Sequence, residues 1–155
     1  MTTAPTEPIR QATLRDLDLV APLFDAYRQF YGLPRDPDLA RAFIGERLSR
    51  GDSVIYLAGS TAAAVGFVQL YPVLSSTSAR PGRLWLLNDL FVTVQARGKG
   101  VARALMERAR ALAVETGATG LFLQTARNNV TARHLYESLG YRLDETFVVY
   151  ELGLQ

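Results

Sequence analysis

The feature that most constrains this sequence is a long apolar segment that ends shortly before two glycines, beyond which a helix begins. Residues 83–94 are nearly all apolar, which is typical of a central strand buried on both faces. Residues 97–117 repeat apolar side chains at helical spacing, which predicts an amphipathic helix. Because Gly98 and Gly100 lie at the junction, the sequence predicts a strand that turns sharply into a helix N-terminus.

The rest of the chain alternates between helical and strand-like spacing. Helices are predicted over residues 13–31, 36–51 and 128–139, and strands over residues 8–12, 53–58, 63–71, 120–125, 141–143 and 146–152. Thr13 and Asp16 have the spacing of a capping box, and residues 73–82 have the composition of a loop. We therefore expect an α/β (mixed α+β) fold, with one mixed, mostly antiparallel sheet of six to seven strands and helices on both faces.

Composition indicates an ordinary globular domain. The chain has 155 residues, of which 48% are hydrophobic and 21% charged, so disorder is excluded as its main state. No apolar run approaches the ~20 residues of a membrane span. We expect a flexible tail over residues 1–7 and a single domain over residues 8–155. No secretory signal pattern opens the sequence, which favours a cytoplasmic protein without a membrane partner.

The residue inventory excludes several kinds of site. The chain has no cysteine, so a disulfide, a thiolate metal site and a cysteine nucleophile are all excluded. His134 is the one histidine and has no second His or Cys with which to bind zinc, which argues against a metal. The basic residues are interspersed with acids and form no stripe with aromatics, so nucleic acid is not an expected partner.

The glycine turn has the properties of an anion site. The first amides of a helix have no internal partner and lie at its positive end, where Arg97 and Lys99 add charge. A P-loop is excluded because Val101 and Ala102 follow Gly100, where Lys and Ser or Thr would be required. The position of the turn, past residue 95, excludes a dinucleotide fingerprint. A glycine-containing loop with a basic helix start remains the alternative.

Several motifs together resemble one family. The segment Arg97-Gly98-Lys99-Gly100-Val101-Ala102 resembles the Q/R-x-x-G-x-G/A signature of GNAT-type N-acetyltransferases, and residues 88–92 resemble the strand before it. Residues 123–125 and 129–141 resemble the closing motif of the family, and residues 9–13 its opening. The resemblance covers nearly the whole chain in the right order and implies a GNAT-like acyl-CoA N-acyltransferase fold.

The resemblance implies acetyl-CoA as a co-substrate, no metal, and transfer of an acetyl group to an amine. It also implies that the pantetheine and pyrophosphate are bound largely through main-chain groups of the strand and the turn. The implied cofactor-binding residues are Leu90, Phe91, Val92, Val94, Arg97, Gly98, Lys99, Gly100, Val101, Ala102, Arg103 and Asn129.

Three further residues are candidates for the chemistry. Tyr136 matches the general acid of the family, and a phenol can donate a proton to the leaving thiolate; a packed core aromatic is the alternative. Asn88 lies where some members have a Glu base, but an amide can only orient the amine or a water. Asp89 is adjacent, and neighbours on a regular strand point to opposite faces, so it would face away from the acceptor if Asn88 faces it. The base therefore stays open.

The acceptor is expected to be the primary amine of a small molecule, such as a simple amine, a polyamine or an amino acid. Tyr27, Tyr31 and Trp85 are the expected acceptor-binding residues, because aromatic rings suit a cationic or apolar amine. The alternatives are a protein or peptide N-acetyltransferase and a non-catalytic acetyl-CoA-binding module. The sequence also leaves a homodimer open.

Overall fold

The computed structural model describes residues 7–76 and 82–154. Within these residues the chain forms five strands and four α-helices. It divides into two compact units, one ending at Leu123 and one beginning at Gln124. The predicted tail lies outside the described residues except for Glu7.

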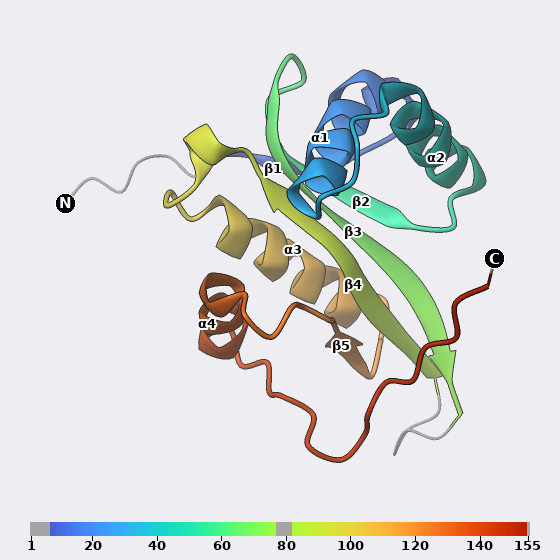
Figure 1. Cartoon of the computed structure of the whole chain (residues 1–155), viewed down its shortest axis with the longest axis vertical. Helices are drawn as coiled ribbons and strands as arrows, with labels where there is room; N and C mark the ends of the chain where they lie inside the picture. The colour runs from blue at the N-terminus through green and yellow to red at the C-terminus, as the bar shows by residue number, and fades with distance from the viewer. Residues whose placement is uncertain (1–6, 77–81, 155) are drawn as a thin grey trace. The chain divides into compact units, whose positions relative to one another are not determined.

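The first unit is built on a sheet with the strand order β1-β2-β3-β4-β5 (Figure 1). The strands are β1 (Ile9–Gln11), β2 (Val54–Gly59), β3 (Ala64–Ser75), β4 (Gly82–Val92) and β5 (Gly120–Phe122). The first four pair antiparallel in succession, whereas β5 pairs parallel with β4. The predicted mixed, mostly antiparallel sheet is thus confirmed, with five strands in the described residues and not six to seven.

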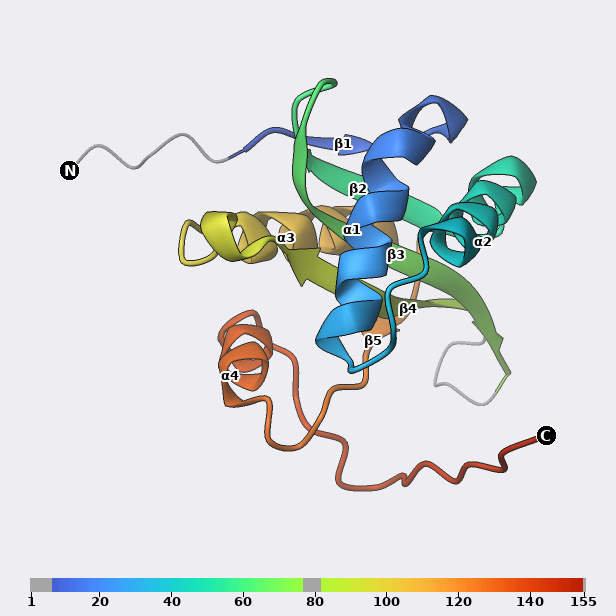
Figure 2. The same ribbon diagram turned by 45° about the horizontal axis from the view of Figure 1, so that its top comes forward.

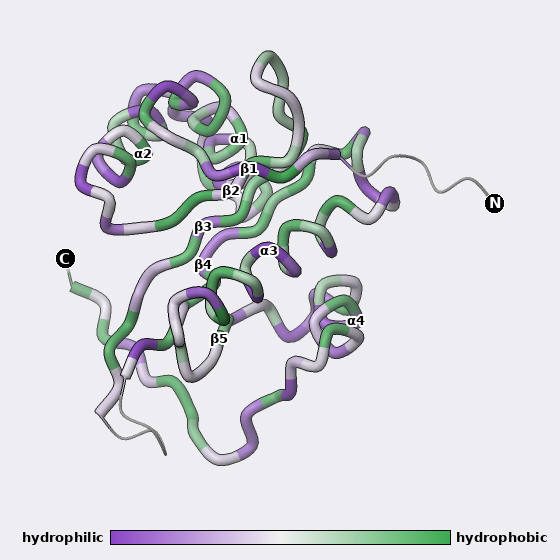
Figure 3. The backbone as a smooth tube through the Cα atoms, turned by 180° about the vertical axis from the view of Figure 1, so that it is seen from behind, coloured by the Kyte–Doolittle hydropathy of each residue, from purple (hydrophilic) through white to green (hydrophobic). Residues whose placement is uncertain are grey.

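Helices cover both faces of this sheet, as predicted. Figure 2 shows α1 (Leu17–Phe30) and α2 (Pro37–Arg50) on one face and α3 (Val101–Glu115) on the other. Figure 3 shows hydrophilic and hydrophobic residues alternating along the helices, as expected where one side of a helix is buried. The core between α1, α2 and the sheet includes Val20, Leu23, Phe24, Ile44, Ile55, Leu57, Phe67 and Phe91.

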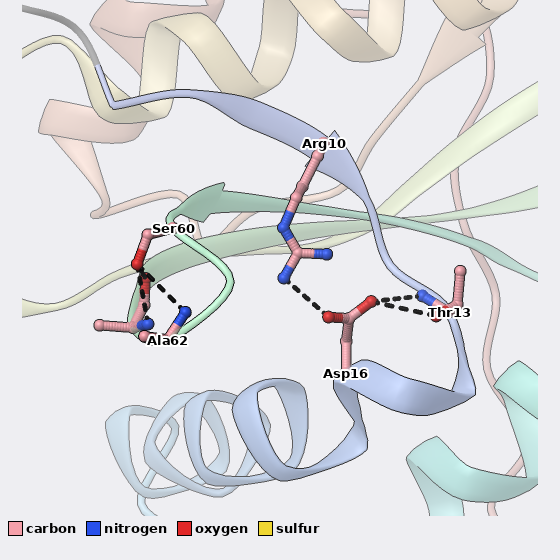
Figure 4. Close-up of polar contacts among 6 residues, drawn as sticks. Arg10, Thr13, Asp16, Ser60 and Ala62 are labelled. Atoms are coloured by element: carbon pink, nitrogen blue, oxygen red, sulfur yellow. Dashed lines mark hydrogen bonds and ion pairs between the residues drawn. The ribbon is translucent and has the colours of Figure 1, made fainter.

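Local signals in the sequence mark the start of the 3-10 helix Leu14–Asp16, which leads directly into α1, and the start of α2. Asp16 accepts hydrogen bonds from the Thr13 amide at 2.8 Å and from Arg10 Nη2 at 2.7 Å, so the predicted capping box is confirmed (Figure 4). Helix α2 begins after Asp36, whose side chain accepts the Leu39 amide at 3.0 Å. Figure 4 also shows the turn before β3, where Ser60 Oγ accepts the amide of Ala62.

The hairpin of β3 and β4 is longer than the sequence predicts. Residues 73–82 were expected to form a loop, yet Val73 pairs with Leu84 and Ser75 pairs with Gly82. Polar residues are acceptable at this end because side chains there are open to solvent, as the 83% exposure of Leu74 indicates, and the pairing of the strands satisfies their amides. Residues 77–81 lie outside the described residues.

The second unit contains α4 (Val130–Ser138) and a closing segment without regular structure. The predicted hairpin of residues 141–143 and 146–152 is wrong for the described structure, in which neither segment is a strand. The turn between them does form, since Asp144 Oδ1 accepts the amides of Thr146 and Phe147. A turn needs only local hydrogen bonds, whereas a strand needs a paired neighbour.

Candidate active site

A bulge in β4 determines the geometry of the candidate site. Gln69 pairs with Asp89 and Leu70 pairs with Leu87, so Asn88 is an extra residue without a partner on β3. An extra residue breaks the alternation of side chains along a strand. As a result Asn88 Nδ2 donates to Asp89 Oδ1 at 3.1 Å, and the two side chains lie together. The expectation that Asn88 and Asp89 point to opposite faces of the sheet, with Asp89 away from the acceptor if Asn88 faces it, is therefore wrong.

Asp89 is a buried carboxylate with several donors around it. Its side chain is 4% exposed and accepts from Gln69 Nε2 at 2.6 Å. The Tyr27 hydroxyl lies beside it and donates to the main-chain oxygen of Asn88 at 3.3 Å. Burial raises the pKa of Asp89 above its ordinary value, while hydrogen bonds from Gln69, Asn88 and Tyr27 oppose that rise. Such a carboxylate is a stronger base than an exposed one.

An aromatic group at the end of α1 lies next to this carboxylate. Tyr27 packs edge-on against Tyr31, with ring centroids 5.0 Å apart, and Tyr31 packs edge-on against Phe30. Phe30 and Tyr31 are more than half exposed. The Arg97 guanidinium lies 5.8 Å from the centroid of Phe30, and Arg97 Nε donates to the main-chain oxygen of Val92 at 3.0 Å. We call Tyr27, Phe30 and Tyr31 the aromatic wall.

The structure does not bring Trp85 to this wall. Trp85 is 4% exposed, and its indole N–H donates to Thr116 Oγ1 at 2.9 Å, just beyond the end of α3. It therefore lies on the face of the sheet opposite to α1, which carries Tyr27 and has Tyr31 as its C-cap. Burial, with the negative charge of Asp89 as a second cause, raises the pKa of Tyr71 to about 12. Tyr71 thus stays protonated and is no candidate base.

Among the described residues, one edge of β4 has no neighbouring strand along its second half. In the part of the chain that the structure describes, β5 pairs with β4 only at Leu84, Trp85 and Leu86. Strand β4 continues to Val92, so its edge beyond Leu86 has no neighbouring strand among these residues. Leu90, Phe91 and Val92 lie on that stretch. An unpaired strand edge presents main-chain donors and acceptors to an extended ligand.

The glycine turn connects this edge to α3. Gly98 and Gly100 have φ values of 72° and 80°, in the left-handed region that favours glycine. Gly100 caps α3 without a side-chain hydrogen bond, and the first turn of α3 carries no acidic residue. Gly98, Lys99 and Gly100 are exposed. The first amides of α3 and the basic side chains near them therefore form a site suited to an anion. Arg97 is turned toward the aromatic wall.

The two remaining candidates lie in the second unit. Asn129 caps α4, where its side-chain oxygen accepts the Ala132 amide at 3.3 Å. Tyr136 is half-buried on α4, and its ring centroid lies 6.1 Å from that of Tyr141. His134 is exposed on the same helix. No helix among the described residues is long and apolar enough to span a membrane, and no three of their acidic or histidine side chains cluster as metal ligands would.

Sequence reasoning did not identify Gln69 and Ser53, which support Asp89. Gln69 is fully buried, and its Oε1 accepts from Ser53 Oγ at 2.8 Å. The one signal in the sequence is an amide inside the otherwise apolar run of residues 65–71. A buried amide requires partners, and the partners here come from two other strand regions that only the fold brings together.

Within the described residues, a strand edge without a neighbour leads into a helix N-terminus that no side chain caps, and this arrangement suits an extended anionic ligand. The family model of the acetyltransferase (GNAT) family matches residues 20–141. The chain belongs to this family and is an acyltransferase.

Individual relatives agree with this assignment. The chain is 44% identical over 146 residues to an uncharacterized N-acetyltransferase, YhfO, of Bacillus subtilis, covering 94% of this chain and 97% of that protein. A crystal structure of a probable acetyltransferase superposes with a TM-score of 0.88 at 45% identity, over 96% of this chain and 99% of that one. A "predicted acetyltransferase" of Clostridium acetobutylicum, solved with acetyl-CoA, shares the fold with a TM-score of 0.76 at 14% identity, over 93% and 95% of the two chains.

Proposed function

We propose that this protein is an acetyl-CoA-dependent N-acetyltransferase that acetylates the primary amine of a small molecule. The observation that carries the proposal is the continuity of the β4 edge, which has no neighbouring strand among the described residues, with the glycine turn and with the N-terminus of α3, which no side chain caps. An acyl-CoA has the matching features, since its pantetheine arm is extended and carries amides, and its pyrophosphate is an anion. The acetyl-CoA in the Clostridium acetobutylicum structure supports the same ligand for this fold.

Each part of the cofactor has a matching group on this chain. Main-chain groups of Leu90, Phe91 and Val92 would pair with the pantetheine amides as an added strand does, whereas Val94 lies beyond β4 in the short 3-10 helix Val94–Ala96. Amides from Gly98 to Arg103 would bind the pyrophosphate, with Lys99 and Arg103 as nearby positive charges. Asn129 would contact the cofactor through the part of its amide that does not cap α4.

The proposed chemistry is direct attack. The amine nitrogen attacks the thioester carbonyl carbon, the C–N bond forms and the C–S bond breaks. The amine loses one proton, and the thiolate of CoA gains one. Tyr136 supplies the proton to the thiolate as the general acid. A main-chain amide near Phe91 or Val92 stabilises the charge that develops on the carbonyl oxygen.

The acceptor side supports a cationic small molecule. An ammonium would be attracted by the buried carboxylate of Asp89 and by the faces of the aromatic wall. Asn88 is exposed beside Asp89 and would orient the amine. Asp89, with its raised pKa, accepts the proton that the amine loses, directly or through a water. Tyr27 and Tyr31 would contact the body of the acceptor.

The first test is a calorimetric titration with acetyl-CoA, in which ATP and NADH serve as controls. Binding of acetyl-CoA alone is the expected result, because ATP and NADH lack the pantetheine arm that pairs with β4. An amine panel is then screened for acceptor-dependent release of free thiol. Equal binding of all three nucleotides would contradict the cofactor assignment, and binding without thiol release for any amine would contradict the transferase chemistry on small molecules.

A further inference from the structure

The hydrogen bonds around Asp89 form a chain with a defined direction. Ser53 Oγ donates to Gln69 Oε1 at 2.8 Å, and Gln69 Nε2 donates to Asp89 Oδ2 at 2.6 Å. From the other side, Asn88 Nδ2 donates to Asp89 Oδ1 at 3.1 Å. Gln69 is 0% exposed and Asp89 is 4% exposed, whereas Asn88 is exposed. This series of hydrogen bonds therefore connects the interior of the sheet to the surface of the candidate site.

The charge of Asp89 determines how both amides are oriented. An ionised carboxylate can only accept hydrogen bonds, so each neighbouring carboxamide must present its NH₂ group to it. The oxygen of Asn88 is then directed away from Asp89. A protonated Asp89 would itself donate a hydrogen bond. The Asn88 carboxamide could then turn by about half a rotation, so that its oxygen faces Asp89 and its NH₂ group faces away from it.

We propose that Gln69 is a positioning residue that, supported by Ser53, keeps Asp89 ionised and so holds the Asn88 carboxamide with its oxygen toward the acceptor amine. The outward oxygen of Asn88 accepts an N–H bond from the amine, and this last step rests on the proposed function. Ser53 contributes because its donation to Gln69 Oε1 leaves the NH₂ of Gln69 for the carboxylate. In this site the residue beside the acceptor amine is therefore the neutral Asn88, where some family members have a Glu. The negative charge is carried by the buried Asp89 behind it.

The other ionisable groups on this face come from three elements. Tyr27 on α1 interacts with Asp89, and Tyr71 on β3 is affected by the charge of Asp89. Arg47, near the end of α2, pairs with Glu46 and with Asp52, and it affects Tyr71 together with Asp52. Tyr71, whose pKa is about 12, stays neutral at ordinary pH. Helix α3 packs on the opposite face, where Trp85 donates to Thr116.

The test follows the titration of Asp89 and the orientation of Asn88 by NMR, without any acceptor. The ¹³Cγ shift of Asp89 and the ¹⁵Nδ2 shift of Asn88 are recorded from about pH 3 to about pH 9 in the wild type and in Gln69→Leu. We expect the midpoint of Asp89 to move to higher pH in Gln69→Leu, because the carboxylate loses a donor. We also expect the Asn88 signal to change with the same midpoint. An unmoved midpoint, or an Asn88 signal that ignores the titration, would overturn the proposal.

Further variants keep the proposal testable if Gln69→Leu does not fold. Ser53→Ala retains Gln69 but removes its supporting donor, so the midpoint should move in the same direction by a smaller amount; Ser53→Thr, which keeps a hydroxyl, should reverse that movement. Thr116→Val is the matched control, because it removes a part-buried hydrogen bond on the opposite face and should leave the Asp89 midpoint in place. A midpoint that is the same in Ser53→Ala and in the wild type would overturn the role of Ser53.

A kinetic measurement separates this proposal from the proposed function. With the most active amine of the panel, the ratio of acceptor kcat/KM in Gln69→Leu to that in the wild type should fall about tenfold toward acid pH, while KM for acetyl-CoA stays unchanged. Taking the ratio cancels the titration of the amine itself. If the NMR midpoints move as expected but no amine is acetylated, the positioning of Asn88 stands and the proposed function fails. If amines are acetylated but the midpoints do not move, the proposed function stands and the role of Gln69 in positioning Asn88 fails.

Discussion

Asn88 and Asp89 are neighbours on β4, yet their side chains are hydrogen-bonded to each other at 3.1 Å. A regular strand would direct them to opposite faces, and the bulge opposite Gln69 and Leu70 removes that alternation. As a consequence, these two adjacent residues have different roles. Asp89 carries a buried negative charge, while Asn88 presents a neutral amide at the surface beside the aromatic wall.

Replacing Gly100 by Asp should abolish the binding of acetyl-CoA. The new carboxylate would lie at the N-terminus of α3, where the pyrophosphate is proposed to bind, and we expect affinity to fall about 100-fold or more. Gly117→Asp is the matched control, because Gly117 has a φ of 63° and, like Gly100, open space around an added Cβ. Calorimetric titration and Tm are measured for both variants. Normal affinity in Gly100→Asp would contradict the assignment of the turn.

Replacing Tyr136 by Phe should slow turnover and leave the affinity for acetyl-CoA unchanged. Loss of a general acid lowers kcat by about 100-fold to about 10,000-fold, because the thiolate must leave without a proton. Tyr150→Phe is a suitable control, since Tyr150 is 91% exposed in the same unit. The measurement is kcat across a range of pH. A rate equal to that of the wild type at every pH would show that Tyr136 is not the acid.

Much of the fold could be predicted because its signals are local. The capping box of Thr13 and Asp16, the helix start at Asp36 and the glycine turn before α3 each depend on residues a few positions apart. The closing hairpin was predicted wrongly from the sequence of residues 141–152, because a strand needs a partner that no local pattern specifies. The Asp144 turn illustrates the difference, since it forms although the flanking segments do not pair.

The site was predictable only in part, for a similar reason. Residues on the turn and on α1 could be named, since periodicity and motif place them on known elements. The bulge at Asn88 could not, because it depends on the register between β3 and β4 over their whole length. The face on which Trp85 lies depends on the same register, and the contact between Gln69 and Ser53 depends on the pairing of β2 with β3.

Tyr31→Ala should raise KM for the acceptor by about tenfold and leave acetyl-CoA affinity unchanged. Loss of one aromatic contact to a cation is worth about that factor when the contact is partly desolvated. Trp85→Phe is the informative comparison, because it removes the hydrogen bond to Thr116 on the opposite face of the sheet. We expect it to lower Tm without changing either KM. Steady-state kinetics with the best amine of the panel distinguish the two, and equal effects on KM would contradict the placement of the acceptor at the aromatic wall.

Two buried aspartates should respond to pH in opposite directions. The hydrogen bond from Arg10 and those from Thr13 lower the pKa of Asp16 below its ordinary 3.8, so its contribution to stability is present above that value and is lost as pH falls through the folded-state pKa. Burial raises the pKa of Asp89 above 3.8, so its contribution is complete below that value and is lost as pH rises through the folded-state pKa.

The two Asp→Asn variants test this contrast directly. Asp16→Asn should lower the free energy of unfolding by about 1–2 kcal/mol near neutral pH, where the capping box is intact in the wild type, and by less as the pH falls through the lowered pKa of that carboxylate. For Asp89→Asn, the free energy of unfolding relative to the wild type should instead rise with pH, because the variant avoids a buried charge. Urea unfolding over a pH series gives both differences. If the difference in the free energy of unfolding from the wild type changed with pH in the same direction for both variants, the hydrogen-bond donors would stabilise the ionised Asp89 more than burial destabilises it. The role of Asp89 as a base of raised pKa would then fail.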